Sequence, residues 1–169
     1  LDGIADTDGR SGEATVRKNK SGIVVKGLHD LAVRFSRCCN PVPGDEIVGF
    51  VTRGRGVSIH RTDCINVINL PEDERGRLID AEWQVAENPT STEQYSTEIQ
   101  IFANNRIGLF ADISKVFTEK QIDITSMNVR TSKQGRATII MTFDIHGTEE
   151  LNRITDKIRQ IDGVLDIQR

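Results

Sequence analysis

The chain has few aromatic residues and no long apolar stretch. Aromatics make up 5% of its 169 residues, with a single Trp and a single Tyr. So few bulky side chains do not predict one large core, and a chain of this length also fits two small domains. Because no run of about 18 apolar residues occurs, we predict no transmembrane helix. The first residues contain no basic and apolar leader, so we expect a cytoplasmic protein without membrane contact.

Cysteine is also scarce, with three residues at Cys38, Cys39 and Cys64. An odd number argues against a framework in which every cysteine is paired in a disulfide. In a reducing compartment such cysteines serve as metal ligands, reactive thiols or small core residues.

Composition divides the chain into four segments. Residues 1–21 and residues 87–95 are polar and predict a disordered end and a linker. Residues 22–86 predict one small domain, and residues 96–169 predict a second. Both combine strand and helix patterns, so the expected fold class is α+β with two small domains.

In the first domain, short apolar runs alternate with turns that contain Gly or Pro. Thr62 or Asp63 is a candidate N-cap for a helix that ends near Leu70, and an acidic loop is expected at residues 71–76. The expected strands lie at residues 23–25, 31–35, 47–51, 57–59 and 78–84.

The second domain has the clearest periodicities. Apolar residues with helical spacing predict one helix from Leu109 and another for which Thr148 is the candidate N-cap. The order β-α-β-β-α-β predicts a four-stranded antiparallel sheet with two helices on one face, the ferredoxin-like arrangement. Its expected strands lie at residues 99–103, 122–130, 137–145 and 164–167.

The residues with the most distinctive chemistry lie in the first domain. His60 and Cys64 are four residues apart, and on a helical turn they would share a face as two ligands of one zinc ion. Cys38 and Cys39 are adjacent, so both can bind the same ion only if the backbone kinks there, which the Pro-rich turn after them favours. Asp63 or His29 could replace one cysteine. The candidate metal ligands are Cys38, Cys39, His60 and Cys64.

Two other interpretations of these residues remain open. The three cysteines could be small core residues, with His60 a hydrogen-bonded loop residue. Alternatively, Cys38 or Cys39 is a thiol nucleophile with His60 as its base, although no third orienting group or oxyanion loop is evident.

Positive charge is concentrated in one part of the chain. Residues 17–61 carry nine Lys or Arg against three acids, although the whole chain has a net charge of −3. Such an excess attracts polyanions, and the planar guanidinium of arginine suits phosphate. Because only Phe35 and Phe50 are available for stacking, recognition of an RNA backbone is favoured, and a solvated charged surface is the alternative. The candidate RNA-binding residues are Arg34, Arg37, Arg53, Arg55 and Arg61.

The segment HDLAVRFSRCCNPVPGDEIVGFVTRGRGVSIHRTDC, residues 29–64, resembles a known domain. It is similar to the zinc-finger-like, or ribosome-intersubunit, domain in the C-terminal regulatory half of RelA/SpoT-type (p)ppGpp synthetase/hydrolases. Residues 105–110 (NRIGLF) resemble the loop of the ACT domain that ends those proteins. The resemblance implies a zinc centre at the four Cys and His residues. It also implies contacts with ribosomal RNA and uncharged tRNA, and control of a catalytic half that lies outside these 169 residues.

The resemblance to ACT domains further implies an amino-acid site at the loop after the first strand. Free N–H groups at a helix start favour a carboxylate, Asn105 is a candidate helix cap, and Asp123 could receive an ammonium group. A branched-chain amino acid is the implied ligand, although Asn105 and Gly108 could equally serve capping and packing alone. The candidate residues are Asn105, Arg106, Ile107, Gly108, Leu109 and Asp123.

We therefore expect a non-catalytic regulatory module of a stringent-response enzyme, which senses amino-acid starvation and forms a homodimer through the edges of its ACT sheet. Two alternatives belong to other classes. One is a thiol-dependent enzyme that uses Cys38 or Cys39 with His60. The other is a dimerisation scaffold without metal or ligand.

Overall fold

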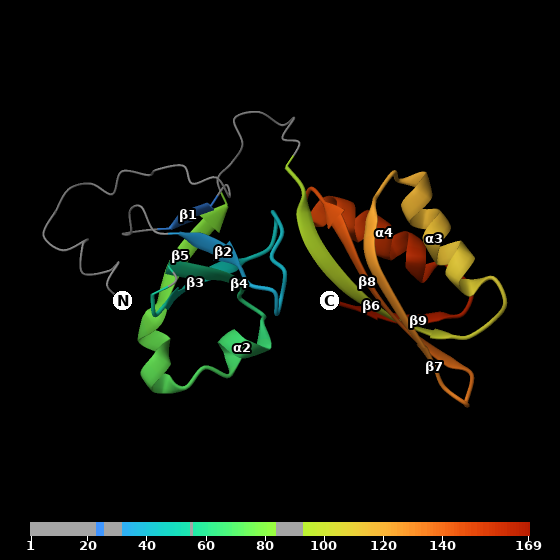
Figure 1. Ribbon diagram of the computed structural model, residues 1–169, viewed down its shortest axis with the longest axis horizontal. Helices are drawn as coiled ribbons and strands as arrows, with labels where there is room; N and C mark the ends of the chain where they lie inside the picture. Colours follow the sequence, from blue (N-terminus) through green and yellow to red (C-terminus); the bar gives the residue numbers. More distant parts are fainter. Residues whose placement is uncertain (1–22, 26–31, 55, 84–92) are drawn as a thin grey trace, which may run out of the picture. The chain divides into compact units, whose positions relative to one another are not determined.

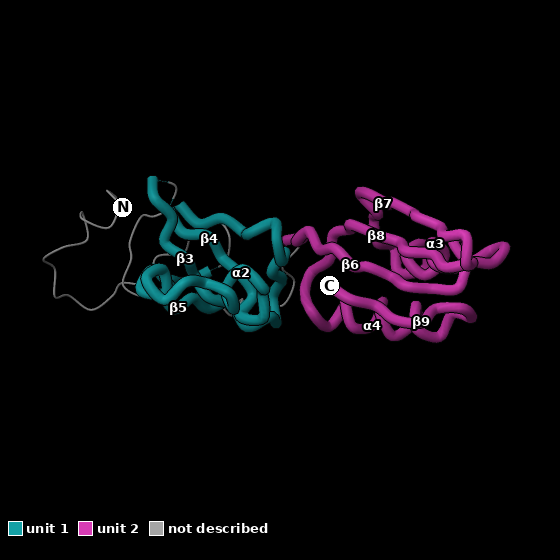
Figure 2. Tube along the Cα trace, turned by 90° about the horizontal axis from the view of Figure 1, so that it is seen from below, with its two compact units in different colours: residues 1–91 teal, residues 92–169 magenta. Residues whose placement is uncertain are grey.

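The computed structural model describes residues 23–25, 32–54, 56–83 and 93–169. The chain forms two compact units, residues 1–91 and residues 92–169 (Figure 2). The predicted disordered end at residues 1–21 lies outside the described residues, as do His29, Arg55 and most of the predicted linker.

Unit 1 is built on a five-stranded sheet with the strand order β1-β5-β3-β4-β2 (Figure 1). Strand β2 runs parallel to β4, and the other neighbouring strands are antiparallel. Its elements are β1 (Ile23–Val25), β2 (Val33–Phe35), β3 (Ile47–Thr52), β4 (Gly56–Arg61), helix α2 (Ile65–Ile68), the 3-10 helix η1 (Glu72–Arg77) and β5 (Leu78–Trp83).

One face of this sheet carries the core of unit 1, because alternate side chains of each strand point to it. The Phe35 and Trp83 rings stack on this face with their centroids 5.6 Å apart. The opposite face carries His60, which is paired across the sheet with Val48, and also Arg34. The buried core residues are Ile23, Val51, Val57, Ile59 and Ala81.

The connection between β4 and β5 differs from the prediction. Helix α2 is a single turn whose N-cap is Cys64, so the assignment of Thr62 or Asp63 as its cap was wrong. The predicted acidic loop contains η1, which begins directly after Pro71. Pro71 is the N-cap of η1, and its carbonyl accepts a hydrogen bond from the Glu74 N–H at 2.9 Å.

Unit 2 is the predicted βαββαβ fold. Its antiparallel sheet has the order β7-β8-β6-β9, and helices α3 and α4 cover one face (Figure 1). The elements are β6 (Tyr95–Asn104), α3 (Leu109–Glu119), β7 (Ile124–Thr131), β8 (Arg136–Ile145), α4 (Thr148–Arg159) and β9 (Val164–Gln168).

The core of unit 2 follows from the alternation in β8, where every second residue from Ala137 to Ile145 is buried. Against this face α3 packs Phe117, whose ring meets the ring of Phe143 edge-on at 4.9 Å. The predicted alternation of apolar and polar positions therefore places the helices on the correct face.

The ends of the elements in unit 2 required three corrections. The N-cap of α4 is Gly147, and Thr148 is already helical. The N-cap of α3 is Gly108, with φ of 83°, and Asn105 does not cap it. Instead, the Asn105 N–H donates to the carbonyl of Gly135 at 2.7 Å. Tyr95, which was predicted to end the linker, begins β6.

Two glycines in the β3–β4 turn allow a direct test of backbone requirements. Gly54 and Gly56 have nearly the same φ, 77° and 78°. An added Cβ at Gly54 would have no described atom within 4 Å, whereas one at Gly56 would collide with the Ala32 carbonyl oxygen. Gly54→Ala is therefore expected to cost about 1–2 kcal/mol for left-handed backbone alone. Gly56→Ala should cost clearly more, as measured by urea unfolding; equal costs would contradict the close approach.

Candidate metal centre

Cys38 and Cys39 lie in a tight turn that directly follows β2. The Asn40 N–H donates to the Ser36 carbonyl at 3.0 Å, and Asn40 has a positive φ of 46°. This kink lets both adjacent thiols face the same point, as the metal hypothesis required. The kink precedes the Pro-rich turn rather than arising within it.

His60 and Cys64 come together through a turn and not through a helix. His60 is the fifth residue of β4, and the Cys64 N–H donates to the Arg61 carbonyl at 3.0 Å in the turn that follows. His60 and Cys64 do come close together, with donor atoms within 4.8 Å, but the predicted helical spacing is not what brings them there.

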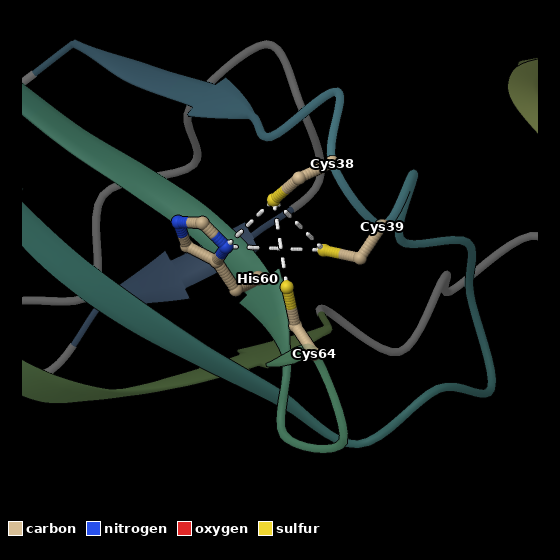
Figure 3. Close-up of side chains that lie close together, drawn as sticks. All are labelled: Cys38, Cys39, His60 and Cys64. Atoms are coloured by element: carbon tan, nitrogen blue, oxygen red, sulfur yellow. Dashed lines mark hydrogen bonds between the residues drawn. The ribbon is translucent and has the colours of Figure 1, made fainter. Parts of the chain in front are cut away.

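The four side chains converge from these two turns, as Figure 3 shows. Their candidate donor atoms all lie within 4.8 Å of one another. The Cys38 Sγ lies 3.3 Å from His60 Nδ1, 3.4 Å from Cys64 Sγ and 4.0 Å from Cys39 Sγ. The Cys39 Sγ lies 3.9 Å from His60 Nδ1. Tetrahedral ligands of one ion, with metal–sulfur bonds of about 2.3 Å, are separated by about 3.5–3.8 Å, so the residues fit a four-coordinate metal.

The protonation states differ within the cluster. Burial raises the pKa of Cys39 to about 12, partly opposed by the Arg61 N–H, which donates to its sulfur at 3.3 Å. Burial also lowers the pKa of His60, which keeps its imidazole neutral and able to donate a lone pair. Burial acts to raise the pKa of Cys38 as well, but the pKa lies below the usual value because of hydrogen bonds with Ser36, Asn66, Cys64 and Cys39.

Three touching thiols cannot all ionise without a compensating positive charge, since like charges at these distances repel. A divalent cation supplies that charge and deprotonates coordinating thiols outright. The arrangement is therefore suited to hold a metal ion.

Of the two alternative ligands, His29 lies outside the described residues, and Asp63 is not part of the cluster. The Asp63 carboxylate lies 3.4 Å from Arg61 Nε, and its side chain is 72% exposed. Cys39 and Cys64 are buried, but neither belongs to the apolar cluster that contains Ile23, Val57 and Ile59. Core packing thus accounts for the burial of two of the cysteines, but not for the convergence of Cys38 and His60 with them.

The candidate RNA-binding arginines are more widely spread than the sequence suggested. Arg34, Arg37 and Arg53 are exposed. Arg37 adjoins the cysteine pair, but Arg53 lies in the β3–β4 turn, beyond the end of β4 at Gly56. Gly56 and His60 are themselves about 13 Å apart along β4, at a rise of about 3.3 Å per residue. The Arg61 side chain is only 13% exposed, so little of its guanidinium is offered to a ligand.

The aromatic side chains of unit 1 already have partners. Phe35 stacks on Trp83, and the guanidinium of Arg77 lies 4.7 Å from the centre of the Phe50 ring. One face of each phenylalanine ring is therefore covered within unit 1.

In unit 2, Arg106 ties the candidate amino-acid loop to its surroundings. Its Nε donates to the Asp162 carbonyl at 2.8 Å, one guanidinium nitrogen donates to the Ile107 carbonyl at 3.1 Å, and the other pairs with Asp112 at 2.7 Å. A ligand carboxylate was expected at the start of α3. In this structure the Asp112 carboxylate already supplies a negative charge there. Sequence reasoning missed this contact, although the i,i+6 spacing of an Arg and an Asp across a helix start was a visible signal.

The other candidate residues of this loop differ in accessibility. Ile107 is fully exposed and Leu109 is fully buried, so Leu109 contributes its side chain to the core and not to a ligand. Asp123 is exposed just before β7. Sequence reasoning also missed Ser36 and Asn66, which hydrogen-bond Cys38.

Within the described parts of the chain, no helix is long and apolar enough to cross a membrane.

Two family models match the chain one after the other. The model of the RelA/SpoT RIS domain matches residues 23–84, and a model of the ACT domain matches residues 91–169. The four residues of the cluster all fall within the first match, and the candidate amino-acid loop falls within the second.

Several bacterial enzymes named GTP pyrophosphokinase are similar to this chain. The protein from Streptomyces coelicolor is 40% identical over 148 residues, which cover 88% of this chain and 17% of the relative. The Escherichia coli K12 protein is 37% identical over 153 residues, covering 90% and 20%. The Haemophilus influenzae protein is 33% identical over 167 residues, covering 98% and 22%. The chain thus spans about a fifth of the length of these relatives.

Among solved structures, the ACT domain of a GTP pyrophosphokinase from Chlorobium tepidum is similar, with 22% identity and a TM-score of 0.42. The match covers 46% of this chain and 99% of that one. The assignment of unit 2 depends on the family model and on its strand order. With both domain models matched in sequence and relatives along most of its length, the chain belongs to the RelA/SpoT family and corresponds to its C-terminal regulatory region.

Proposed function

We propose that this chain is a non-catalytic regulator of a (p)ppGpp-metabolising enzyme, in which a zinc-centred unit contacts RNA and an ACT unit senses an amino acid. The observation that carries the proposal is the convergence of four metal-binding side chains within the RIS match. Nothing in this role requires the chain to make or degrade (p)ppGpp by itself. Turnover of labelled nucleotide by the purified chain would contradict it.

Zinc is the metal that the donor set favours. Thiolates and imidazole are ligands of a borderline-soft ion, and three sulfurs with one nitrogen form a closed tetrahedral set that is typical of structural zinc. The ion would join the turn after β2 to the turn after β4 and so fix the end of the sheet. In small units such binding contributes directly to folding.

The zinc proposal predicts about one zinc per chain in protein purified without a metal-affinity tag. Cys64→Ser should lose the metal and lower the melting temperature of unit 1, because one of four ligands is gone. Ser36→Ala is the matched control, since it removes a hydrogen bond to Cys38 and no ligand. Elemental analysis measures the zinc content of wild type and of both variants, and thermal unfolding measures their melting temperatures. A well-folded wild-type protein without metal would reject the metal centre.

RNA binding by unit 1 is supported by charge and by exposure. Arg34 lies on the same sheet face as His60, Arg37 is next to Cys38, and Arg53 is at the far end of β4. These exposed guanidinium groups are spread along unit 1, and such spacing suits contacts with a phosphate backbone. We propose ribosomal RNA and uncharged tRNA as the partners.

Arg34→Glu, Arg37→Glu and Arg53→Glu are each expected to weaken RNA binding in a filter-binding titration. Each should also reduce the slope of log affinity against log salt by about 0.7–0.9 for every phosphate that the variant no longer neutralises. Arg153→Glu, an equal change of charge at an exposed position of α4, is the control. Unchanged affinity in all three variants would remove RNA from the proposal.

In unit 2 we place the amino-acid ligand at the loop between β6 and α3. Its carboxylate would compete with Asp112 for Arg106, whose ion pair is 31% and 51% exposed and therefore weakly held. The exposed Asp123 carboxylate would receive the ammonium group. A branched-chain side chain could lie against Ile107, which is fully exposed at the loop tip.

Leucine, isoleucine or valine is therefore expected to raise the melting temperature of unit 2. At a hundredfold excess over Kd the stabilisation is about 2.7 kcal/mol. Asp123→Asn should abolish the shift, whereas Asp156→Asn, on exposed helix α4, should keep it. Differential scanning calorimetry measures the melting temperature with each amino acid. If none of the three raises it, unit 2 does not bind a branched-chain amino acid.

We also propose that β7 forms the homodimer contact. It is the edge strand of the sheet, and Met127 and Val129 remain 38% and 36% exposed although their β8 partners are fully buried. A second copy paired along this edge would cover them and continue the sheet.

The variant Met127→Glu/Val129→Glu is expected to dissociate the dimer, because the two-fold contact brings four carboxylates together. Leu165→Glu, on the opposite edge strand β9 and 51% exposed, is the matched control. Light scattering coupled to gel filtration measures the mass. A dimer that only Leu165→Glu dissociates would assign the contact to β9 instead.

A thiol-dependent enzyme is the second candidate, because Cys38 Sγ and His60 Nδ1 are 3.3 Å apart. Within the described residues, however, no carboxylate is grouped with this His60, so nothing orients its ring as a catalytic base requires. Rapid, selective alkylation of Cys38 in metal-loaded protein at neutral pH would favour the enzyme over the metal centre.

A further inference from the structure

Within the cluster, Cys38 and Cys64 are the best-matched pair for a covalent bond. Their sulfurs are 3.4 Å apart, and both thiols are free. A disulfide requires about 2.0 Å between sulfurs, so the side chains must close by little more than an ångström. The two residues come from separate turns, which leaves their backbones free of the constraint that joins sequence neighbours.

The other nearby pair is poorly placed for the same reaction. Cys38 and Cys39 have sulfurs 4.0 Å apart and are adjacent in sequence. Their Cα atoms are held about 3.8 Å apart by the shared peptide bond, below the usual range for a disulfide. The geometry therefore selects Cys64 as the partner of Cys38.

Cys38 is the cysteine that an oxidant from solvent can reach first, because it is the exposed one. Cys38 is exposed, whereas Cys39 and Cys64 are 7% and 3% exposed. A small oxidant that arrives from solvent reaches the Cys38 sulfur without opening the turn after β4. The cluster thus combines an accessible thiol with a sheltered one at reacting distance, which is typical of redox-sensitive sites.

We propose that Cys38 is an oxidation site, at which a hydroperoxide converts Cys38 and Cys64 into a disulfide. The Cys38 sulfur attacks a peroxide oxygen, the O–O bond breaks, and the products are a Cys38 sulfenic acid and water. The Cys64 sulfur then attacks the Cys38 sulfur and displaces hydroxide, which leaves as water after taking a proton. Two thiols lose two electrons, and one molecule of hydrogen peroxide is reduced to two of water.

The consequence for the metal rests on the proposed zinc centre. A disulfide removes two of the four ligands, and the Cys39 and His60 that remain cannot complete a tetrahedral site. Oxidation would then release the ion and loosen the end of the sheet that it joins. Unit 1 would in that case report oxidant as well as RNA.

The bond can be mapped in the 169-residue chain after treatment with hydrogen peroxide, alkylation of residual thiols and digestion with trypsin. Cleavage after arginine gives one peptide, residues 38–53, that carries Cys38 and Cys39, and another, residues 62–75, that carries Cys64. We expect the two peptides to be cross-linked within one chain, with a single alkylated thiol. Fragmentation between the two adjacent cysteines should place the bond on Cys38.

Variants give an independent reading. Cys39→Ser should keep the cross-link, and Cys38→Ser should lose it. An internal bond between Cys38 and Cys39, a cross-link that survives Cys38→Ser, or one confined to covalent dimers would overturn the assignment. Because wild-type fragmentation already locates the bond, the result does not depend on how well either variant folds.

A zinc-loaded sample separates this inference from the proposed function. Peroxide should release about one zinc per disulfide formed, followed with a chromogenic chelator, and a thiol reductant with added zinc should restore binding. A chain that takes up no zinc but forms the Cys38–Cys64 bond keeps the oxidation site and loses the metal centre. A chain that binds zinc but, once reduced and metal-free, forms no such bond overturns the oxidation site alone.

Discussion

The turn that places Cys64 beside His60 is the constraint on which the candidate metal centre depends, because it brings their donor atoms within 4.8 Å of each other. The turn after β4 must reverse within three residues to bring them together, and it does so with a hydrogen bond from Cys64 to Arg61. The same residue then begins α2, since the N–H groups of Val67 and Ile68 donate to its carbonyl. One cysteine therefore ends a strand connection, starts a helix and offers its thiol to the centre, so a change there cannot be local.

His60 brings the cluster to the sheet face opposite the apolar core, where a bound metal would add a second kind of stabilisation to unit 1. Its hydrophobic face is small, with five buried residues in the described part, and β2 and β1 have three residues each. Small sheets of this kind often need a further cross-link. A metal ion on the other face would supply it where β2 and β4 end, the parallel pair that no tight hairpin joins.

Sequence patterns predicted unit 2 better than unit 1 for a physical reason. In β8, alternation over ten residues fixes both the strand and its buried face, and helix α4 repeats its apolar residues at helical spacing. In unit 1 the strands are short, and pairing of β2 with β4 depends on contacts between distant segments. The four cluster residues were predicted from their chemistry, but their geometry was not, because a helical spacing was assumed where Cys64 lies in a turn. The predicted helix caps were also wrong. The sequence favoured Asn105 and Thr148 as the N-caps of α3 and α4, but the N-caps are Gly108 and Gly147.

The arginines show how far adjacency in sequence can mislead about a surface. Arg53 and Arg61 are eight residues apart, yet β4 carries the chain from one end of the sheet to the other between them. Arg61 turns inward beside Asp63 and gives its N–H to Cys39, while Arg53 remains in solvent. Arg37 and Arg61 both adjoin a cluster residue in sequence, yet only Arg61 is withdrawn from solvent, whereas Arg37 stays exposed like Arg53. A basic segment in a small sheet divides in this way because strand alternation and turn position, and not charge, decide which side chains reach the solvent.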